Sequence, residues 1–367
     1  MRLQSTARRL GTLAIVGSLV AACTTAATPQ PTPPPTTGPA PTGAASPTAP
    51  TGELPKAELA SIKIGFAAGG EVSSAAAILA SLDKIFEKYG MSATLSTFEG
   101  SGRAVSALQS AQIDIGFSDT GSALSSQLTD VPLVVVGINA TSLTDDLVCQ
   151  ASIKTAADVK GKKVAISTFG GTSHAAALLS LKALNLSVTD ASITQVGGQG
   201  TRLAALTGGS IDCAIIDKVL QKEMIAQGFS IVASIWKPPT QSFGRSAMLV
   251  RKEFLQKNPN TVLVALAANL EGQNMIWTDV AKASRLWGQW AQTDEARSRP
   301  LMDDFQTVGN RGLQWEDGAF TNAQKVIAAV NPDIIDVNIA DAMDRSLLQK
   351  LLDIGFYAKI NNPVTTP

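Results

Sequence analysis

The sequence has little charge, almost no histidine and few cysteines. Its 367 residues include one histidine and three cysteines, and 16% are charged, compared with about 25% in average proteins. One histidine excludes a histidine-rich metal site, and no Cys/His spacing matches a zinc motif. The 30 basic residues are balanced by 30 acidic ones, so no basic excess is available to neutralise phosphates. We expect no metal, no cofactor and no nucleic-acid partner.

Catalytic and nucleotide-binding motifs are also missing. Lys162 follows Gly161 without the rest of a phosphate-binding loop, and the pair Gly198 and Gly200 lacks the third glycine of a dinucleotide fingerprint. No nucleophile elbow occurs. The histidine, His174, has no acidic residue within about ten positions to orient it as a general base. We expect His174 to contact a ligand or to pack at a helix start, and we predict no enzymatic activity.

The N-terminus has the order of a secretory signal. Arg2, Arg8 and Arg9 precede an apolar run over residues 10–20, and small residues lead to Cys23. The run is shorter than the roughly 20 residues that span a membrane. The segment ending at Cys23 resembles a bacterial lipobox, which implies that residues 1–22 are removed and Cys23 is lipidated. An ordinary signal peptide with a chance cysteine and a permanent transmembrane helix are the alternatives.

A proline-rich segment follows the signal. Ten of the 18 prolines lie in residues 24–55, where few large apolar side chains could offset the entropy of ordering. At about 3.1 Å per residue, extended polyproline II could reach roughly 100 Å. We predict a disordered tether over residues 23–56. Loss of the three signal arginines would leave an excess of about three negative charges.

The remaining chain reads as α/β. Residues 73–89 have the apolar period of a helix, and residues 260–293 form a second helical region. Between the helices lie short runs that favour strands. The predicted strands are residues 61–66, 92–98, 113–117, 133–138, 163–167, 192–196, 213–216 and 230–235.

One unit of this pattern occurs twice. A glycine-rich loop, an Ala-Leu pair and an Ile-Asp turn before a strand, in residues 100–119, align without a gap with residues 198–217 at an offset of 98. We infer two similar α/β lobes. Asp114 and Asp212, the paired turn residues, should bond backbone N–H groups between helix and strand.

Glycine, serine and threonine collect where the predicted strands end. In open α/β sheets ligands bind beyond the carboxyl ends of the strands. Helix N-termini there offer unpaired N–H groups, and glycine permits close approach. These loops therefore favour a small polar or anionic ligand. The relevant loops are residues 67–71, 99–103, 118–122, 167–174 and 197–202.

The pattern Asp158-Val-Lys-Gly-Lys-Lys-Val164, followed by Gly170-Gly-Thr-Ser-His174, resembles the solute-binding proteins of nitrate, sulfonate, taurine and thiamine-pyrimidine-precursor ABC importers. The resemblance covers roughly residues 61–250. It implies the type II periplasmic-binding-protein clamshell, two α/β lobes joined by two hinge crossings near residues 145–149 and 230–237. Lobe one would comprise residues 57–144 and 241–367, and lobe two residues 145–240.

The same resemblance implies a set of ligand contacts. They fall on Ala68, Gly69, Gly70, Ser118, Asp119, Thr120, Thr168, Gly170, Gly171, Thr172, Ser173, His174 and Asp217, with Gly198 as a further candidate. The sequence lacks the dense cationic cluster that would favour nitrate or sulfonate. Arg103 and Arg202, the cations of the glycine loops, lie in first helical turns, where we expect them to point outward.

Other side chains have simpler interpretations. We expect Cys149 and Cys213 to be buried free thiols, with a disulfide as the alternative. Trp277, Trp287 and Trp290 should pack in the core. Trp236 lies at the proposed second crossing, from which it could reach the ligand.

These expectations combine into one function. We predict a monomeric lipoprotein, anchored to the membrane outside the cytoplasm, that captures a small polar, sulfonate-like, nitrate-like or heterocyclic molecule for an ABC permease and its ATPase. One alternative is an enzyme like thiamine-pyrimidine synthase, whose family depends on a histidine and a cysteine cluster; the cluster is missing here. The other is a ligand-sensing lipoprotein that serves a signalling partner.

Overall fold

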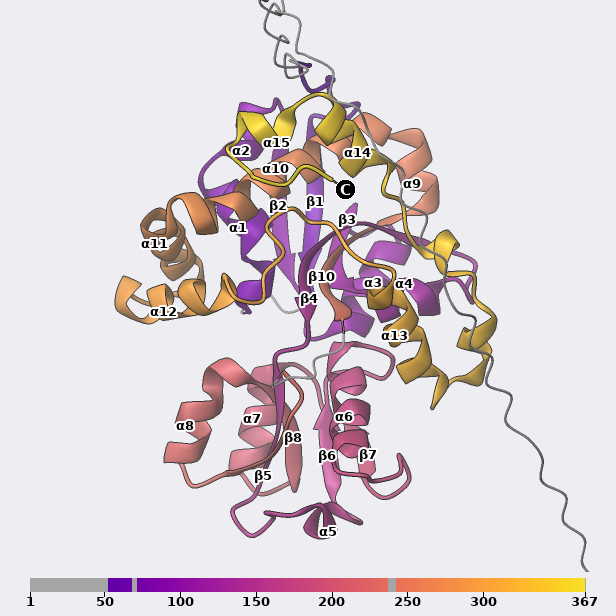
Figure 1. The fold of residues 1–367 in the computed structure, drawn as a ribbon, viewed down its shortest axis with the longest axis vertical. Coiled ribbons are helices and arrows are strands. Elements are labelled where there is room, and N and C mark those ends of the chain that lie inside the picture. The colour runs from indigo at the N-terminus through magenta and orange to yellow at the C-terminus, as the bar shows by residue number, and fades with distance from the viewer. Residues whose placement is uncertain (1–51, 68–70, 237–241, 367) are drawn as a thin grey trace, which may run out of the picture. The chain divides into compact units, whose positions relative to one another are not determined.

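The computed structural model describes residues 52–67, 71–236 and 242–366 (Figure 1). The predicted signal, the tether up to residue 51, Cys23, Ala68, Gly69 and Gly70 lie outside these residues. No helix within the described ranges is long and apolar enough to cross a membrane.

Two five-stranded mixed sheets organise the chain. The first sheet has the order β2 (Ser92–Thr97), β1 (Ser61–Phe66), β3 (Ile115–Asp119), β10 (Ser242–Arg251), β4 (Leu133–Ser142). The second has the order β7 (Ser192–Gln195), β6 (Lys163–Ile166), β8 (Cys213–Asp217), β5 (Asp145–Cys149), β9 (Ser230–Ser234). In each sheet three parallel strands are followed by two antiparallel pairings. The matching order confirms the predicted pair of similar α/β lobes in a periplasmic-binding-protein type II fold.

Lobe one here means the first sheet with its helices, and lobe two the second sheet with its helices. Lobe one carries α1 (Ala75–Leu82), α2 (Ile85–Lys88), α3 (Ser101–Gln109), α4 (Thr120–Ser126), α9 (Lys252–Lys257), α10 (Pro259–Thr278), α11 (Val280–Ala291), α12 (Glu295–Phe305), α13 (Gly318–Ala328), α14 (Ser346–Asp353) and α15 (Phe356–Lys359). Lobe two carries α5 (Ala156–Val159), α6 (Thr172–Ala183), α7 (Gln199–Thr207) and α8 (Gln221–Ala226). Short 3₁₀ turns are η1 (Val72–Ser74), η2 (Lys218–Leu220), η3 (Pro332–Asp336) and η4 (Ile339–Ala342).

Side-chain alternation explains the strands that the sequence predicted well. In β1, Ile62 and Ile64 are buried while Ser61 and Lys63 are exposed, the period-2 pattern of a half-buried strand. The predicted helix over residues 73–89 is interrupted instead. Lys84 has a left-handed backbone (φ 57°) and separates α1 from α2, so the apolar period continues across two helices.

The duplicated Ile-Asp turns make the same hydrogen bond in both lobes. The carboxylate of Asp114 accepts a hydrogen bond from the backbone N–H of Lys63 at 2.8 Å. Asp212 accepts from the N–H of Lys163, also at 2.8 Å. Each bond connects the turn before one parallel strand to the neighbouring parallel strand, β1 or β6, so the predicted structural role is confirmed.

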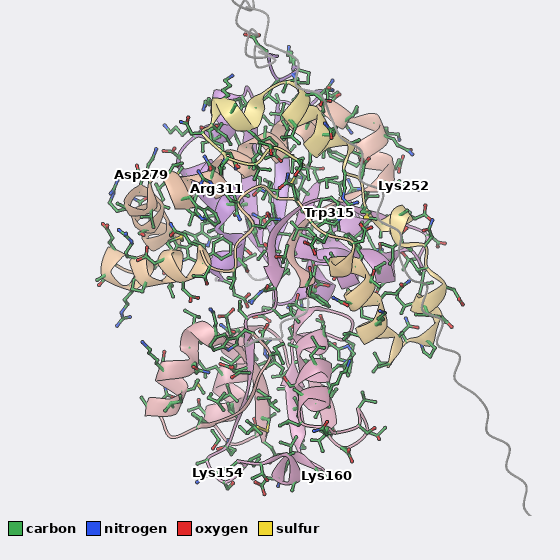
Figure 2. The ribbon with its side chains drawn as sticks, in the orientation of Figure 1. Lys154, Lys160, Lys252, Asp279, Arg311 and Trp315 are labelled. Atoms are coloured by element: carbon green, nitrogen blue, oxygen red, sulfur yellow. A yellow bond between two sulfur atoms is a disulfide. The ribbon has the colours of Figure 1, made fainter. Side chains whose placement is uncertain are left out.

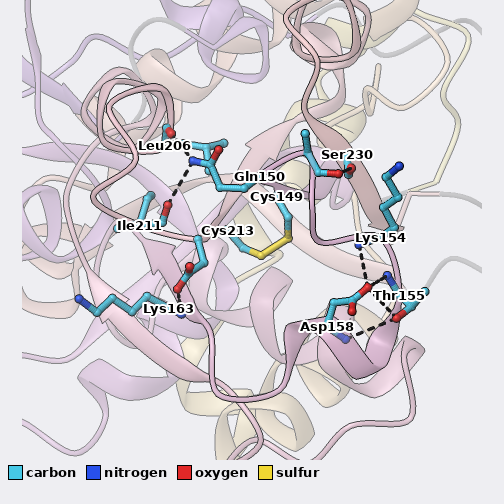
Figure 3. The surroundings of a disulfide bond; sticks show 12 residues. Cys149, Gln150, Lys154, Thr155, Asp158, Lys163, Leu206, Ile211, Cys213 and Ser230 are labelled. Atoms are coloured by element: carbon cyan, nitrogen blue, oxygen red, sulfur yellow. Dashed lines mark hydrogen bonds between the residues drawn. A yellow bond between two sulfur atoms is a disulfide. The ribbon is translucent and has the colours of Figure 1, made fainter.

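The two cysteines of lobe two form a disulfide, so the expectation of free thiols is wrong. Cys149 of β5 and Cys213 of β8 are directly opposed in antiparallel register, with Cα atoms 4.0 Å apart (Figure 3). The sequence analysis did not predict β5, because the family resemblance assigned residues 145–149 to a hinge crossing. Without that strand, nothing indicated that the two cysteines face one another.

The connections between the lobes are shorter than expected. Residues 143 and 144 join β4 to β5, and the return runs from the end of β9 to β10, partly through residues 237–241. The proposed crossings at residues 145–149 and 230–237 thus consist largely of strands β5 and β9 of the second sheet.

The C-terminal half of the chain completes lobe one. Helix α10 is buried around most of its circumference, which matches its apolar sequence. The segment between α12 and α13, on which Figure 2 labels Arg311 and Trp315, is fixed to this helix where Arg311 donates to Asn274 at 2.6 Å. Trp287 of α11 is 1% exposed, which confirms its predicted place in the core.

Candidate functional site

A cavity of about 630 Å³ is lined by both lobes. This volume lies within the usual range of small-molecule sites. Side chains that line it from lobe one include Glu71, Ser73, Phe98, Glu99, Ser101, Phe117, Ser118, Arg245 and Trp290. Those from lobe two include Asp145, Ser167, Thr172, Ser173, Gln199, Thr201, Arg202, Leu203 and Leu220. We call this cavity the interlobe cleft.

Part of the predicted contact set lines the interlobe cleft. Ser118, Thr172 and Ser173 do, together with the further candidate Gly198. The following predicted residues are not among its lining: Asp119, Thr120, Thr168, Gly170, Gly171, His174 and Asp217. Trp236 is not among it either, and its indole N–H donates to Asp146 at 2.9 Å.

Several of these other residues connect the two lobes directly. Asp119, which is fully buried, caps α4 by accepting from Ser122 N–H at 2.8 Å. Its second oxygen accepts from the Thr172 N–H at 3.1 Å and hydroxyl at 2.9 Å, across the lobe boundary. Thr168 likewise accepts from the N–H of Gly102 at 3.1 Å. The lobes are therefore in contact in this structure, beside the cleft.

Glycine allows this close approach. A Cβ placed on Gly171 would lie 2.8 Å from the Cβ of Ser101 in the opposite lobe, closer than such atoms pack. Gly171 therefore belongs to the contact surface between the lobes.

A buried arginine anchors the inner wall of the cleft. Arg245 of β10 is 4% exposed and pairs with Glu71 at 2.5 Å and with Asp217 at 2.7 Å. Burial alone would lower the pKa of Arg245, but Glu71, Asp145 and Asp217 raise it well above its usual value. The guanidinium thus remains charged and holds three carboxyl groups together.

Asp145 is the third of these carboxyl groups and lines the cleft. It lies 3.7 Å from Arg245, and its Oδ2 is buried without a hydrogen-bond partner in the described residues. Burial raises the pKa of Asp145 to about 7, with Asp217 and Glu71 adding to the shift and Arg245 opposing it. Near neutral pH this carboxyl can therefore act as donor or acceptor toward a ligand.

Arg202 departs from its predicted outward orientation. It is 3% exposed and donates to the backbone oxygens of Ile215 at 3.0 Å and Gly197 at 2.7 Å. Burial lowers the pKa of Arg202. Its remaining terminal nitrogen makes no hydrogen bond within the described residues, so it is available to a ligand. Arg103 does point outward, 3.6 Å from Glu99 on the surface.

Sequence reasoning missed Arg245, Asp145, Phe98 and Trp290 as cleft residues. Arg245 carried a usable signal, because it is a charge within the apolar run of residues 243–250, and buried charges are rare unless paired. Trp290 lies three residues after the buried Trp287, and the helix places it at the cleft although we expected core packing. Phe98 gave no signal, since it ends a predicted strand like many core aromatics.

No metal site accompanies these groups. Within the described ranges, no cluster of three or more histidine, cysteine, aspartate or glutamate side chains could hold an ion.

The profile of one protein family matches residues 55–287 and is described as NMT1-like. The chain belongs to the NMT1-like family. A relative in Brucella abortus, named as a binding protein, is 26% identical over 250 residues, covering 66% of this chain and 76% of the relative.

Solved structures share the fold at low sequence identity. The alkanesulfonate-binding protein SsuA of Xanthomonas axonopodis has a TM-score of 0.65 at 18% identity, covering 78% of this chain and 99% of that one. The nitrate-binding protein NrtA of Synechocystis has 0.62 at 16%, covering 85% and 91%. The desulfurization enzyme DSZB also shares the fold, at 0.56 and 13%, covering 80% and 99%. The fold is thus that of binding proteins, and it also hosts an enzyme.

Proposed function

We propose that this NMT1-like protein is an extracytoplasmic solute-binding lipoprotein that delivers a small molecule to an ABC importer. The interlobe cleft carries the proposal. Its walls come from both lobes, so a ligand inside it would contact both and favour their closed arrangement. The structural neighbours SsuA and NrtA are named as alkanesulfonate-binding and nitrate-binding proteins, which supports the same role here.

The side chains of the cleft favour a ligand that carries both donors and acceptors. Arg202 offers a free nitrogen, and serine and threonine hydroxyls also line the cleft. Opposite charges are present as well, because Glu71 and Asp145 also line the cleft. Arg245 is already paired with carboxylates, so a bare oxyanion would find one available guanidinium group beside acidic neighbours. Aromatic surface is added by Phe98, Phe117 and Trp290. Among the predicted ligand classes, this surface favours a heterocyclic molecule.

A thermal-shift screen of the purified protein tests the proposal. Sulfonates, nitrate, bicarbonate, pyrimidines and other small heterocycles are added in turn, and a ligand at 100 times its dissociation constant should stabilise the fold by about 2.7 kcal/mol. Any hit should lose affinity in Arg202→Gln by roughly tenfold or more, because a charged hydrogen bond is lost. Arg103→Gln, at an exposed arginine, is the matched control. If no compound shifts the melting temperature, or if both variants behave alike, the cleft is not the solute site.

The proposed anchor has its own test. We expect Cys23→Ser to release the protein from membranes during fractionation. Continued retention in the membrane fraction would contradict lipidation at Cys23.

A further inference from the structure

A second cavity, of about 590 Å³, lies between α6 and α13. Gly170 and His174 line it, whereas Thr172 and Ser173 line the interlobe cleft. The first turn of α6 therefore separates the two cavities. We call the second one the α6–α13 pocket.

The walls of the α6–α13 pocket are mostly apolar. Phe169, Val188 and Ile193 come from lobe two, and Ile327 and Val330 from lobe one. Phe169 is 57% exposed and Val330 44%, although large apolar side chains are normally covered. No charged side chain lines the pocket, so it offers nothing to compensate an ionic ligand.

His174 supplies a buried polar side chain to this lining. It is 2% exposed, and its Nδ1 accepts a hydrogen bond from the N–H of Gly170 at 3.0 Å. Burial lowers the pKa of His174, so the ring stays neutral. A neutral ring that accepts at Nδ1 carries its proton on Nε2.

That Nε2–H group has no acceptor. It is buried and without a hydrogen-bond partner in the part of the chain that the structure describes. A buried donor without a partner costs about 1–3 kcal/mol, and such groups in folded proteins usually meet a partner. Ser125 and Asn331, from lobe one, place two further polar side chains around the pocket.

We propose that the α6–α13 pocket binds an uncharged small molecule with an apolar or aromatic body and one oxygen acceptor, which takes the Nε2–H of His174. The volume fits such a ligand, and the apolar walls provide its affinity. Because both lobes contribute walls, occupancy favours the lobe contact seen here and strengthens ligand binding in the interlobe cleft by linkage. The proposal does not depend on the identity of the cleft ligand.

Acetophenone and ethylbenzene make a matched pair of probes, since they share size and shape but only acetophenone has an acceptor oxygen. His174 is the single histidine of the sequence, so its imidazole nitrogen signals in ¹H–¹⁵N NMR need no assignment by mutation. We expect the free full-length chain to show the Nε2–H tautomer. Titration with acetophenone should shift the Nε2 signal saturably, and ethylbenzene should bind roughly tenfold more weakly.

Three variants sharpen the test. His174→Phe removes the donor and keeps an aromatic ring, so both probes should then bind alike in ligand-detected NMR. Val330→Asp places a charge at the exposed rim of the pocket and should abolish binding without disturbing the core. Ile225→Asp, at a side chain of α8 that is 56% exposed, is the control and should bind both probes as the native protein does.

Either of two results would overturn the proposal. One is an Nε2 signal that does not move at saturating acetophenone. The other is equal affinity of both probes for the native protein, because the histidine would then contribute no hydrogen bond. Val330→Asp remains informative if His174→Phe fails to fold, since unchanged acetophenone binding there would also place the ligand elsewhere.

Discussion

Asp119 and Asp217 occupy the same position in the duplicated units, yet they connect the lobes in different ways. Each uses Oδ1 to cap the helical turn of its own lobe, accepting from Ser122 N–H in one case and from Val219 N–H in the other. Each uses Oδ2 to reach the other lobe. Asp119 meets the neutral donors of Thr172, whereas Asp217 meets the guanidinium of Arg245.

This difference indicates that the Asp119–Thr172 contact can open when the lobes separate, whereas the Asp217–Arg245 contact stays closed. The donors around Asp119 include Thr172 at a helix start, and water can replace them when the lobes part. The carboxylate of Asp217 is held with Glu71 and Asp145 around a buried arginine next to the connection between β4 and β5. Such a group is costly to expose or to leave without its partner. We infer that lobe motion takes place on the Asp119 side and pivots on the Asp217 side.

The largest expected effect on stability comes from removing the positive charge of Arg245 at the pivot. Arg245→Gln would leave the mostly buried carboxylates of Glu71 and Asp217 without a counter-charge, so the free energy of unfolding should fall by about 3–5 kcal/mol. Denaturant titration at neutral pH measures this. Arg299→Gln, at an exposed pair with Asp303, should change it by less than about 1 kcal/mol. Equal losses in the two variants would contradict the assigned role of Arg245.

The sequence predicted the features that occur in both duplicated units. It did not predict the contacts that depend on strands β5 and β10. The turn roles of Asp114 and Asp212, the repeated strands and the paired loops follow from local patterns, and these were found. Arg245, Asp145 and the Cys149–Cys213 bond depend on β5 and β10. Both strands lie in the sheets far from their sequence neighbours, so local patterns cannot place them. Asp119 was correctly located at the end of its strand, but its partner Thr172 lies in the other lobe.

Weakening the Asp119 contact should have the next largest effect. Asn in place of Asp119 can still accept from Ser122 N–H, but its amide would face the N–H of Thr172. The closed arrangement should lose roughly 2 kcal/mol, and the radius of gyration without ligand should increase in small-angle scattering. Asp114→Asn, at a turn within lobe one, is the control. A closed Asp119→Asn protein would show that this contact does not hold the lobes.

A smaller effect is expected from filling the space between the lobes. Gly171→Ala would place a methyl group 2.8 Å from the Cβ of Ser101, and overpacking of this kind costs about 1–3 kcal/mol. Gly171 has an extended backbone, so the change adds no strain within lobe two. We expect unchanged unfolding but weaker binding of any cleft ligand in calorimetry. Gly318→Ala, where the nearest atom is the Cβ of Ser242 at 3.8 Å and which lies outside the cleft lining, should bind normally.

The pH dependence of the pivot is the smallest effect and follows from Asp145. Its pKa is raised from 3.8 to about 7 in the folded protein, so the folded state holds a proton that the unfolded state has released. The stability due to this proton is fully present below about pH 4 and is lost as the pH rises through 7. Between pH 6 and 8 the native protein should therefore lose about 1.4 kcal/mol, most of it below pH 7, measured by denaturant titration at each pH. Asp145→Asn, which cannot ionise, should show a flatter profile over the same range, while Asp158→Asn, at a partly exposed carboxylate in the capping box of α5, should keep the native slope. A native profile that is flat between pH 6 and 8 would show that Asp145 is already ionised, so that three carboxylates share the single guanidinium of Arg245.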